Sequence, residues 1–264
     1  MQTEYISLAW WQVAVAAALI LINGAISLVL QLRLGKRLLV ASLRMTVQLL
    51  LIGYLLNTIF AIDSWPAVAA LILIMTVIAG RAAASRTHIG FPGKQGAAIV
   101  SVAFSGWFVT VLALQLVITP EPWWHPQYAI PLLGMILGNA LTGISLGMER
   151  FVVGTQQRRS EIEGRLVLGA SRFEAVAPIT GDAIRTGMIP ILNTMTVAGI
   201  VSLPGMMTGQ LLAGAEPLDA VRYQIVIMFL IAAAVAMGTV GAVLLSLRRV
   251  TTREHQLLWL EQDG

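Results

Sequence analysis

Long stretches without a charged residue alternate with short charged connectors along the chain. A helix needs about 17 or more apolar residues to cross the hydrocarbon core of a bilayer, and seven charge-free stretches are long enough. They comprise residues 5–32, 45–62, 64–80, 95–120, 122–148, 186–215 and 223–247. The pattern predicts an all-α fold with about seven transmembrane helices, in which residues 1–264 form a single transmembrane domain.

The composition supports this class of fold. Hydrophobic residues make up 57% of the chain and charged residues 11%, against about 25% charged residues in soluble domains. These values exclude a water-soluble fold. The chain has no cysteine, which excludes disulfides and thiolate metal sites.

The positions of the basic residues predict the orientation of the helices. With the N-terminus outside, every Lys and Arg except Arg222 falls in an inside segment. The acidic residues of the outside segments are Glu4, Asp63, Glu121, Glu216 and Asp219. The positive-inside rule therefore favours an N-out, C-in protein with an odd number of crossings. Because topology alone produces this asymmetry, the net charge of +4 gives no reason to expect a nucleic-acid partner.

The first apolar stretch is expected to be a retained helix. It lacks the basic n-region and the A-x-A-like cleavage site of a signal peptide. Trp10 and Trp11 lie where an interfacial aromatic belt is expected, and Trp65, Trp123 and Trp124 fall at the other outside ends.

Residues 149–185 form the one long inside connector, where a cytoplasmic partner would dock. Ser160–Glu163 and Ser171–Glu174 both have the S-x-x-E form of a capping box. Gly169 lies between them and suits the end of a helix. The pattern predicts two helices joined by a tight glycine turn on the cytoplasmic membrane surface. An ordinary amphipathic helix that rests on the bilayer would show the same pattern.

The spacing within this connector resembles the EAA loop with which bacterial ABC permeases engage their ATPase. Glu163 precedes Gly169 by six residues, and Ile179 follows that glycine by ten. The resemblance implies a short coupling helix that fits a groove on the ATPase. It differs at Gly164-Arg165, where Ala-Ala is usual, and at Gly181-Asp182, where Leu-Pro often ends the motif. The coupling residues that it implies are Glu163, Gly169, Ala170, Ser171 and Phe173.

Several further stretches resemble the FetB-type iron-export permeases, a family that includes plant homologues linked to aluminium tolerance. The similar stretches are IPLLGMILGNA at 130–140, LGA at 168–170, VSLPGMMTG at 201–209, AG at 213–214 and YQI at 223–225. The first half of the chain agrees mainly in length and hydropathy. The resemblance implies a homodimeric permease of a bacterial inner membrane that works with two copies of a separate ABC ATPase and exports iron. ATP and Mg²⁺ would be bound by that partner, and no cofactor is expected in this chain.

The stretch 186–215 contains several residues that weaken a helix, namely Pro190, Gly199, Pro204, Gly205 and Gly209. Such a density predicts a broken sixth helix. Non-helical backbone at membrane depth is tolerated where protein buries it or where it lines a wet cavity. The break is therefore the expected wall of a translocation pathway.

Polar and soft side chains near the break are the candidates for contact with cargo. Met206 and Met207 offer thioether ligands, although methionine also fills irregular cores, so a packing role is the alternative. Asn139 could line the pathway or form an interhelical hydrogen bond. The full set of predicted pathway residues is Asn139, Asn193, Pro204, Gly205, Met206, Met207 and Gln210.

The residues themselves neither demand nor forbid iron as the cargo. The three histidines, His88, His125 and His255, lie in or near connectors, and the apolar stretches contain no carboxylate. Another metal, a chelate or a nucleotide sugar are alternative cargoes, and the direction of transport rests on the resemblance.

Other classes of function would require particular sequence motifs. The chain has no G-x-x-x-x-G-K-[ST] loop, so an ABC function requires a separate ATPase. It also lacks H-E-x-x-H and G-x-S-x-G, which disfavours a membrane-embedded enzyme. A stand-alone secondary transporter or channel is the main rival, but it would normally carry a coupling charge within the membrane.

Overall fold

The computed structural model describes residues 8–62, 64–88, 90–252 and 256–257. These residues form α-helices and one π-helical continuation, with isolated bridges and no β-strand among them. In chain order the helices are α1 (Trp10–Val29), α2 (Gly35–Ile62), α3 (Trp65–Ser85), α4 (Lys94–Leu112) with η1 (Ala113–Ile118), α5 (Pro126–Gln157), α6 (Arg159–Val167), α7 (Arg172–Val197), α8 (Gly205–Leu212) and α9 (Pro217–Val250). The predicted all-α fold is confirmed.

Six of these helices are long and apolar enough to cross a membrane. They are α1, α2, α3, α4 with η1, α5 and α9. Helix α7 is more polar, because it begins well before the charge-free stretch and includes Arg172, Glu174, Asp182 and Arg185. Of the charges that predict orientation, Glu4, Asp63 and Arg253 lie outside the described residues.

The predicted interruption of the sixth apolar stretch is confirmed. Helix α7 ends at Val197 and α8 begins at Gly205. The connector predicted at 149–185 is mostly helical: it comprises the last turns of α5, all of α6 and the first half of α7.

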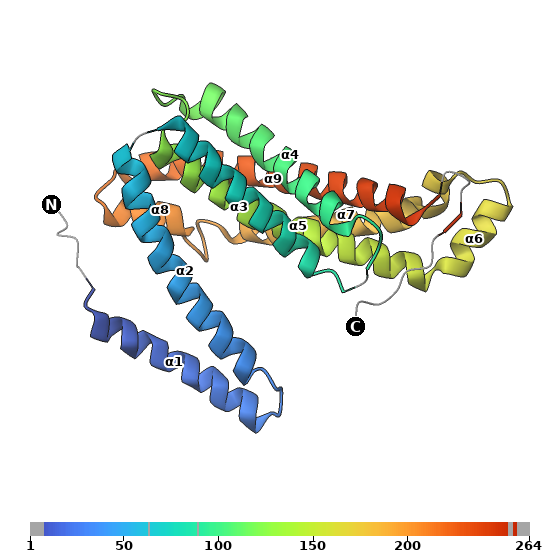
Figure 1. Ribbon diagram of the computed structural model, residues 1–264, viewed down its shortest axis with the longest axis horizontal. Helices are drawn as coiled ribbons and strands as arrows, with labels where there is room; N and C mark the ends of the chain where they lie inside the picture. The colour runs from blue at the N-terminus through green and yellow to red at the C-terminus, as the bar shows by residue number, and fades with distance from the viewer. Residues whose placement is uncertain (1–7, 63, 89, 253–255, 258–264) are drawn as a thin grey trace.

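Five helices form the main bundle, with α5 and α9 at its centre. Helix α5 packs against α3, α4, α7 and α9, and α9 also packs against α4 and α7. Figure 1 shows that α6 lies at one end of this bundle and α8 towards the other. We call these the elbow end, marked by α6, and the tryptophan end, marked by Trp65, Trp123 and Trp124, which line one pocket.

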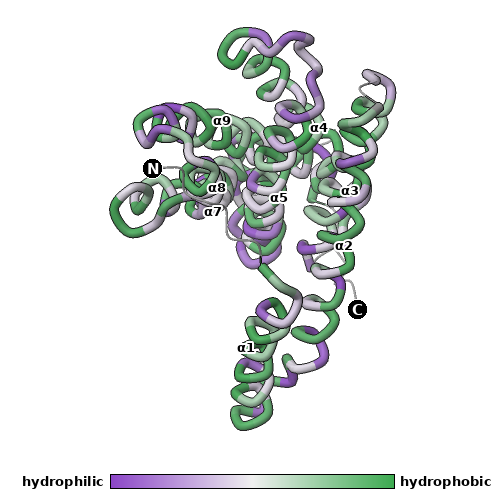
Figure 2. The backbone as a smooth tube through the Cα atoms, turned by 90° about the vertical axis from the view of Figure 1, so that its left-hand side faces the viewer, coloured by the Kyte–Doolittle hydropathy of each residue, from purple (hydrophilic) through white to green (hydrophobic). Residues whose placement is uncertain are grey.

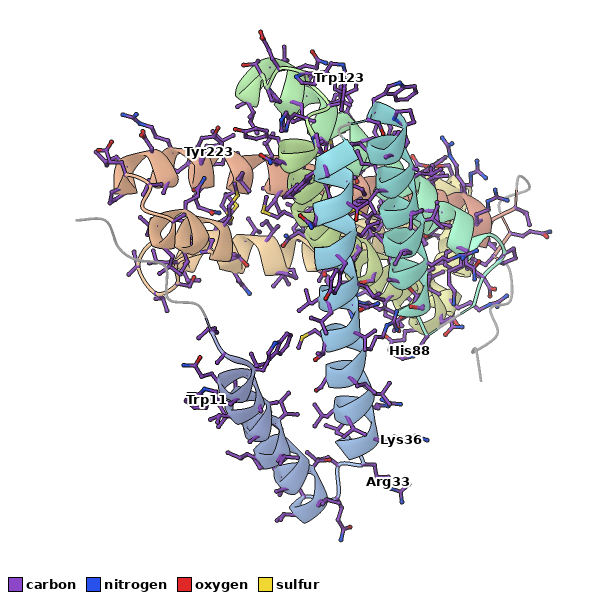
Figure 3. All side chains as sticks on the ribbon, turned by 60° about the vertical axis from the view of Figure 1, so that its left-hand side comes forward. Trp11, Arg33, Lys36, His88, Trp123 and Tyr223 are labelled. Carbon is purple, nitrogen blue, oxygen red and sulfur yellow. The ribbon has the colours of Figure 1, made fainter. Side chains whose placement is uncertain are left out.

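The α1–α2 hairpin projects away from the main bundle (Figure 1). Its residues are mostly hydrophobic (Figure 2), yet most of them are exposed in the single chain. Arg33 and Lys36 lie at the turn of the hairpin (Figure 3). The second half of α2 holds the hairpin to the bundle through Ile52, Leu56 and Ile59. The rest of the hairpin therefore offers its apolar surface to lipid or to another protein.

The helices α5, α7 and α9 approach one another most closely around two glycines. A Cβ atom at Gly187 would lie 2.6 Å from the carbonyl oxygen of Gly143 and 2.5 Å from Cγ2 of Thr239. A Cβ atom at Gly143 would lie 2.9 Å from the carbonyl oxygen of Gly187. Small residues allow such close contact between membrane helices. This crossing, formed by Gly143, Gly187 and Thr239, fixes the position of α7 in the bundle.

We expect Gly187→Ala to lower the free energy of unfolding by about 1–3 kcal/mol, the usual cost of overpacking. Gly181→Ala is the matched control, because it lies on the same helix and its added Cβ would meet nothing within 4 Å. The control should be neutral or stabilising by up to about 1 kcal/mol. Unfolding in mixed detergent micelles, followed by circular dichroism, measures both. Equal stability of the two variants would show that α7 does not depend on this close contact.

Candidate functional site

The chain makes a tight turn between α7 and α8. Gly199 adopts a φ of +83°, and its N–H donates to the carbonyl of Ser202 at 2.9 Å. Glycine reaches this left-handed conformation without the steric cost of a side chain. Pro204 then forms the N-cap of α8. The interruption is thus a defined turn that follows from the predicted helix-weakening residues.

A cavity of about 500 Å³ lies between this turn, the end of α7 and the first turns of α9. Its volume is within the range of about 300–1,000 Å³ that is usual for small-molecule sites. The side chains that give it its chemical character are Met195, Met207, Gln224, Met228 and Phe229. We call it the methionine cavity.

Gln224 is the polar side chain of the methionine cavity. It is 8% exposed, and its Oε1 atom has no hydrogen-bond partner among the described residues. A buried acceptor without a partner costs about 1–3 kcal/mol. The Oε1 atom itself has almost no accessible surface, so Gln224 carries an unpaired acceptor that is enclosed within the wall of the cavity.

The structure divides the predicted pathway residues into two groups. Pro204 and Met207 line the methionine cavity. Gly205 is the first residue of α8, and Met206 packs against the buried cluster of the bundle. Gln210 resembles Gln224 in having a buried Oε1 without a partner, although it is not part of the cavity wall.

The two predicted asparagines lie elsewhere in the bundle. Asn139 on α5 and Asn193 on α7 are both exposed in the single chain. Nδ2 of Asn139 donates to the carbonyl of Met135 at 2.9 Å, one turn earlier in the same helix. Neither asparagine lines the methionine cavity.

Sequence reasoning missed Met195, Gln224 and Met228 as cavity residues. Gln224 carried a usable signal, because it is a polar residue near the start of the apolar stretch 223–247. Met228 lies four residues later and therefore on the same face of α9. Met195 gave no such signal, since its place beside α9 depends on how α7 and α9 pack.

The described residues contain no group of three or more His, Cys, Asp or Glu side chains that could hold a metal ion. The methionine cavity is lined by methionine side chains and one glutamine side chain instead, all of which are neutral. Thioethers favour soft metals such as Cu(I), whereas Fe²⁺ suits imidazole and carboxylate. The cavity is thus chemically unlike a cage for an iron ion.

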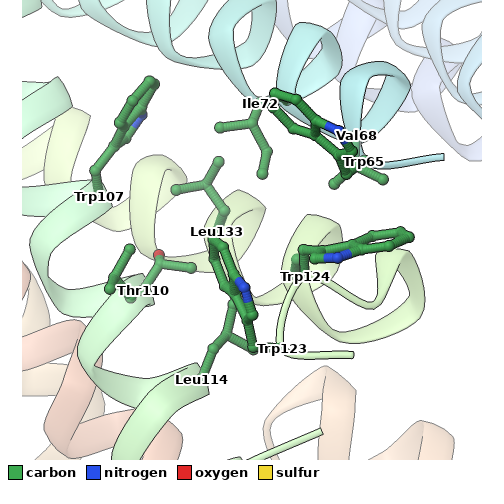
Figure 4. A pocket seen from close by; sticks show the side chains of 12 residues that line it. Trp65, Val68, Ile72, Trp107, Thr110, Leu114, Trp123, Trp124 and Leu133 are labelled. Carbon is green, nitrogen blue, oxygen red and sulfur yellow. The ribbon is translucent and has the colours of Figure 1, made fainter. Parts of the chain in front are cut away.

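A second cavity, of about 390 Å³, lies at the tryptophan end (Figure 4). Trp65, Trp107, Trp123 and Trp124 surround it, and Nε1 of Trp107 donates to Oγ1 of Thr76 at 2.9 Å. Indole rings gather at the interface between membrane and water because one edge is polar and the rest apolar. None of the predicted pathway residues line this pocket. Trp65, Trp123 and Trp124, which are expected in the aromatic belt, lie together here.

The predicted helix–glycine–helix arrangement is present, and we call it the elbow: α6, residues 168–171 and the first turn of α7. Gly169 has a φ of +93°, and its N–H donates to the carbonyl of Leu166 at 3.0 Å. The N–H of Ala170 donates to the carbonyl of Arg165, also at 3.0 Å. These two bonds form a Schellman motif, which ends α6.

One of the two predicted capping boxes is confirmed. Ser171 is the N-cap of α7, and its N–H and Oγ both bond to Oε2 of Glu174, at 2.8 and 2.7 Å. The hydrogen bonds from the Ser171 side chain and backbone lower the pKa of Glu174, so that its carboxylate is favoured. The box predicted at Ser160 is wrong, because Arg158 is the N-cap of α6.

Two ion pairs lie on the surface of α6. Glu163 pairs with Arg159 at 2.7 Å, and Glu161 pairs with Arg165 at 2.7 Å. Because both pairs are partly exposed, each stabilises the helix by between a few tenths of a kcal/mol and about 1 kcal/mol. They stiffen α6 without anchoring it.

The elbow is anchored by one apolar face and exposes another. Ile162 is 1% exposed within the buried cluster, and Leu166 and Ala170 pack against it. Val167 and Leu168, in contrast, are 87% and 89% exposed, and Phe173 is 45% exposed. The coupling residues implied by the sequence did not include Val167 and Leu168. The elbow therefore presents an apolar tip, formed by Val167, Leu168 and Phe173, to its surroundings.

Helix α7 connects the elbow with the methionine cavity. It begins within the elbow at Arg172, passes the close crossing at Gly187 and ends beside the cavity at Val197. Pro178 and Pro190 lie inside it, and each removes a backbone hydrogen bond and favours a bend. The elbow and the methionine cavity are therefore joined by a single helix.

We expect Gly169→Ala to open the elbow turn, because alanine at positive φ costs about 1–2 kcal/mol. Gly164→Ala is the control, since Gly164 lies inside α6 and an added Cβ meets nothing within 4 Å. Backbone hydrogen exchange at positions 169 and 170 should be about 5 to 30 times faster in the first variant than in the wild type. If exchange at these two positions is unchanged, the positive φ at position 169 does not strain an alanine.

The fold defines the class of the protein: a multi-pass α-helical membrane protein with a cavity beside an interrupted helix. The chain belongs to the uncharacterised protein family UPF0014, whose model matches residues 10–251. UPF0014 membrane protein slr1647 of Synechocystis is 40% identical over 227 residues, 86% of this chain and 88% of that relative.

Two further relatives bear on function. The probable iron export permease protein FetB of Escherichia coli is 30% identical over 252 residues, 93% of each chain. UPF0014 membrane protein STAR2 of rice is 32% identical over 229 residues, 87% of this chain and 78% of that relative. The predicted relation to the FetB-type family is confirmed. No solved structure matches the chain.

Proposed function

We propose that the chain is the membrane-spanning permease subunit of an ABC transporter that exports iron from the cytoplasm. A separate ATPase subunit would bind and hydrolyse ATP with Mg²⁺, and this chain would carry no cofactor. The observation that carries the proposal is the elbow, whose exposed apolar tip continues into a helix that reaches the methionine cavity. Iron is inferred from the Escherichia coli relative, the probable iron export permease protein FetB.

The proposal includes seven crossings, with α7 as the sixth in chain order. At about 1.5 Å per residue, the 26 residues of α7 span about 39 Å. This length would return the chain from the elbow end to the start of α9. An N-out, C-in orientation in a bacterial inner membrane then puts the elbow in the cytoplasm, as the positive-inside rule favours.

The elbow is the proposed docking site for the ATPase. Glu163, Gly169, Ala170, Ser171 and Phe173 are the coupling residues implied by the EAA-like spacing. The exposure of Val167 and Leu168 adds an apolar contact at the tip. Buried apolar anchors supply much of the binding energy in protein interfaces. The Schellman turn and the Ser171–Glu174 box would hold these residues in a fixed shape.

A second copy of the chain is the proposed membrane partner. Polar side chains are costly where they face lipid, yet Asn139 and Asn193 are exposed in the single chain. A second copy would cover them and place them along a pathway between the two permeases. The exposed α1–α2 hairpin offers further apolar surface for the same contact.

We expect Leu168→Asp to reduce both ATPase co-purification and ATP-driven iron accumulation by about tenfold or more, because a tenfold loss needs only about 1.4 kcal/mol. A carboxylate at an apolar contact costs more than this unless it is paired. Inside-out vesicles with the partner ATPase and radioactive iron provide the transport assay.

Leu218→Asp is the control, because Leu218 is an exposed leucine in the first turn of α9, far from the elbow in sequence. It should leave co-purification unchanged. Normal ATPase binding in Leu168→Asp would refute the docking assignment. In the wild type, ATP hydrolysis without iron accumulation would point to another cargo, and accumulation without ATP would point to a secondary transporter.

A further inference from the structure

The α1–α2 hairpin carries charge of one sign. Its basic residues are Arg33, Lys36, Arg37 and Arg44, and residues 5–62 contain no Asp or Glu. All four are exposed, and no ion pair or side-chain hydrogen bond joins them to another described residue. We call these four residues the hairpin cluster. Arg33 and Lys36 lie at the turn, away from the main bundle (Figure 3).

Basic residues near the elbow have acidic partners within the chain. Arg165 pairs with Glu161 at 2.7 Å, and Arg185 pairs with Asp182 at 3.2 Å. The positive-inside rule concerns Lys and Arg, and carboxylates contribute little to it. Orientation therefore accounts for the basic residues of the hairpin, but it does not require that they lack acidic partners. The charge of the hairpin cluster is left for an anion from outside the chain.

The turn that presents the hairpin cluster has a defined structure. Ser27 is 4% exposed, and its Oγ accepts a hydrogen bond from the N–H of Leu34 at 2.9 Å. Its carbonyl accepts another from the N–H of Leu32, also at 2.9 Å. Gln31 and Arg33 adopt left-handed φ values of +52° and +55°. The basic side chains at the turn therefore project from a backbone that is tied to the end of α1.

The hairpin cluster lies at the level of a membrane surface. Helix α1 has 20 residues and is about 30 Å long, which matches the hydrocarbon core of a bilayer. The turn that follows it therefore reaches the lipid headgroups. Arg37 and Arg44 are about two turns apart on one face of α2. The stem of Arg44 can lie along the acyl chains while its guanidinium extends to the same headgroup layer.

We propose that the hairpin cluster binds the phosphate groups of anionic phospholipids and so anchors the hairpin at that face of the membrane. Each Lys or Arg near an anionic membrane surface raises the affinity about fivefold. Among the described residues, the bundle holds the hairpin through the second half of α2, and about 25 Å of helix separates Gly35 from Ile52. The lipid contact is a second attachment at the opposite end. This inference goes beyond the proposed function and depends on neither the cargo nor the ATPase.

The test compares two lipids beside one reporter. Leu34 is 41% exposed at the turn and the chain has no cysteine, so Leu34→Cys gives a single site for a bimane fluorophore. The labelled protein is placed in nanodiscs of phosphatidylcholine with increasing fractions of a quenching lipid. That lipid is phosphatidylglycerol or phosphatidylcholine with a nitroxide near the top of one acyl chain. Leu218→Cys, in the first turn of α9, carries the control reporter.

We expect phosphatidylglycerol to reach half of its full quenching of the Leu34→Cys reporter at a mole fraction about tenfold or more below that of phosphatidylcholine. The Leu218→Cys reporter should show no such preference. Arg37→Gln should reduce the preference about fivefold, whereas Arg37→Lys, which keeps the charge, should retain it. Arg150→Gln is the matched control, because Arg150 is an exposed arginine in the main bundle, and it should leave the preference unchanged.

Three results would overturn the inference. Equal quenching by the two lipids at the turn would remove the lipid preference, and this comparison needs no change to the hairpin cluster. Equal effects of Arg37→Gln and Arg150→Gln would assign the preference to the overall charge of the protein. Loss of the preference in inorganic phosphate, but not in sodium chloride of the same ionic strength, would assign the cluster to a free anion. Because the assay contains neither ATPase nor cargo, its outcome is independent of the transport assay.

Discussion

The close crossing of α5, α7 and α9 is the constraint on which the rest of the structure depends. Helix α7 is polar at its start and contains two prolines, so propensity alone would hold it poorly in a membrane bundle. Gly143 and Gly187 let its backbone approach α5 at a distance that no side chain would allow. Dispersion contacts are then made along both neighbours, which is how membrane helices associate in the absence of a hydrophobic driving force.

That crossing also gives the molecule its functional layout. One end of α7 belongs to the elbow, where the apolar tip is exposed, and the other end forms a wall of the methionine cavity. The two sites thus share a helix that is fixed in its middle and weakened by proline on either side. Such a helix can pivot, and a pivot would convert a movement at the elbow into a change at the cavity.

Much of the fold followed from local properties of the sequence. Charge-free length predicted the apolar helices, and the residues from Pro190 to Gly209 predicted the interruption, because backbone preferences act within a few residues. The elbow was predicted for the same reason, through Gly169 and the Ser171–Glu174 box. Helix α5 extends beyond residue 148, where the apolar stretch ends. The charged residues at 149–150 do not end the helix, because their side chains can be accommodated by solvent or by protein.

The candidate site was less predictable, because it is made of residues that meet only after packing. Met195 and Met228 come from different helices, and neither differs locally from a methionine that fills a core. The error at Ser160 has a similar origin: the S-x-x-E pattern permits a capping box but does not fix where a helix begins, and the path of the chain from α5 put the N-cap at Arg158. The exposure of Leu168 also depends on packing, because Ile162 decides which face of α6 is held against the bundle.

One measurement tests whether the elbow controls the cavity through α7. The chain has no natural cysteine, so Ile200→Cys, in the exposed turn between α7 and α8, gives a single reactive thiol. Its rate of labelling by a small maleimide is followed in the complex with the ATPase, with and without a non-hydrolysable ATP analogue. The account predicts that nucleotide changes the labelling rate and that Gly169→Ala abolishes the change. An identical rate in both nucleotide states, in a complex that hydrolyses ATP, would contradict it.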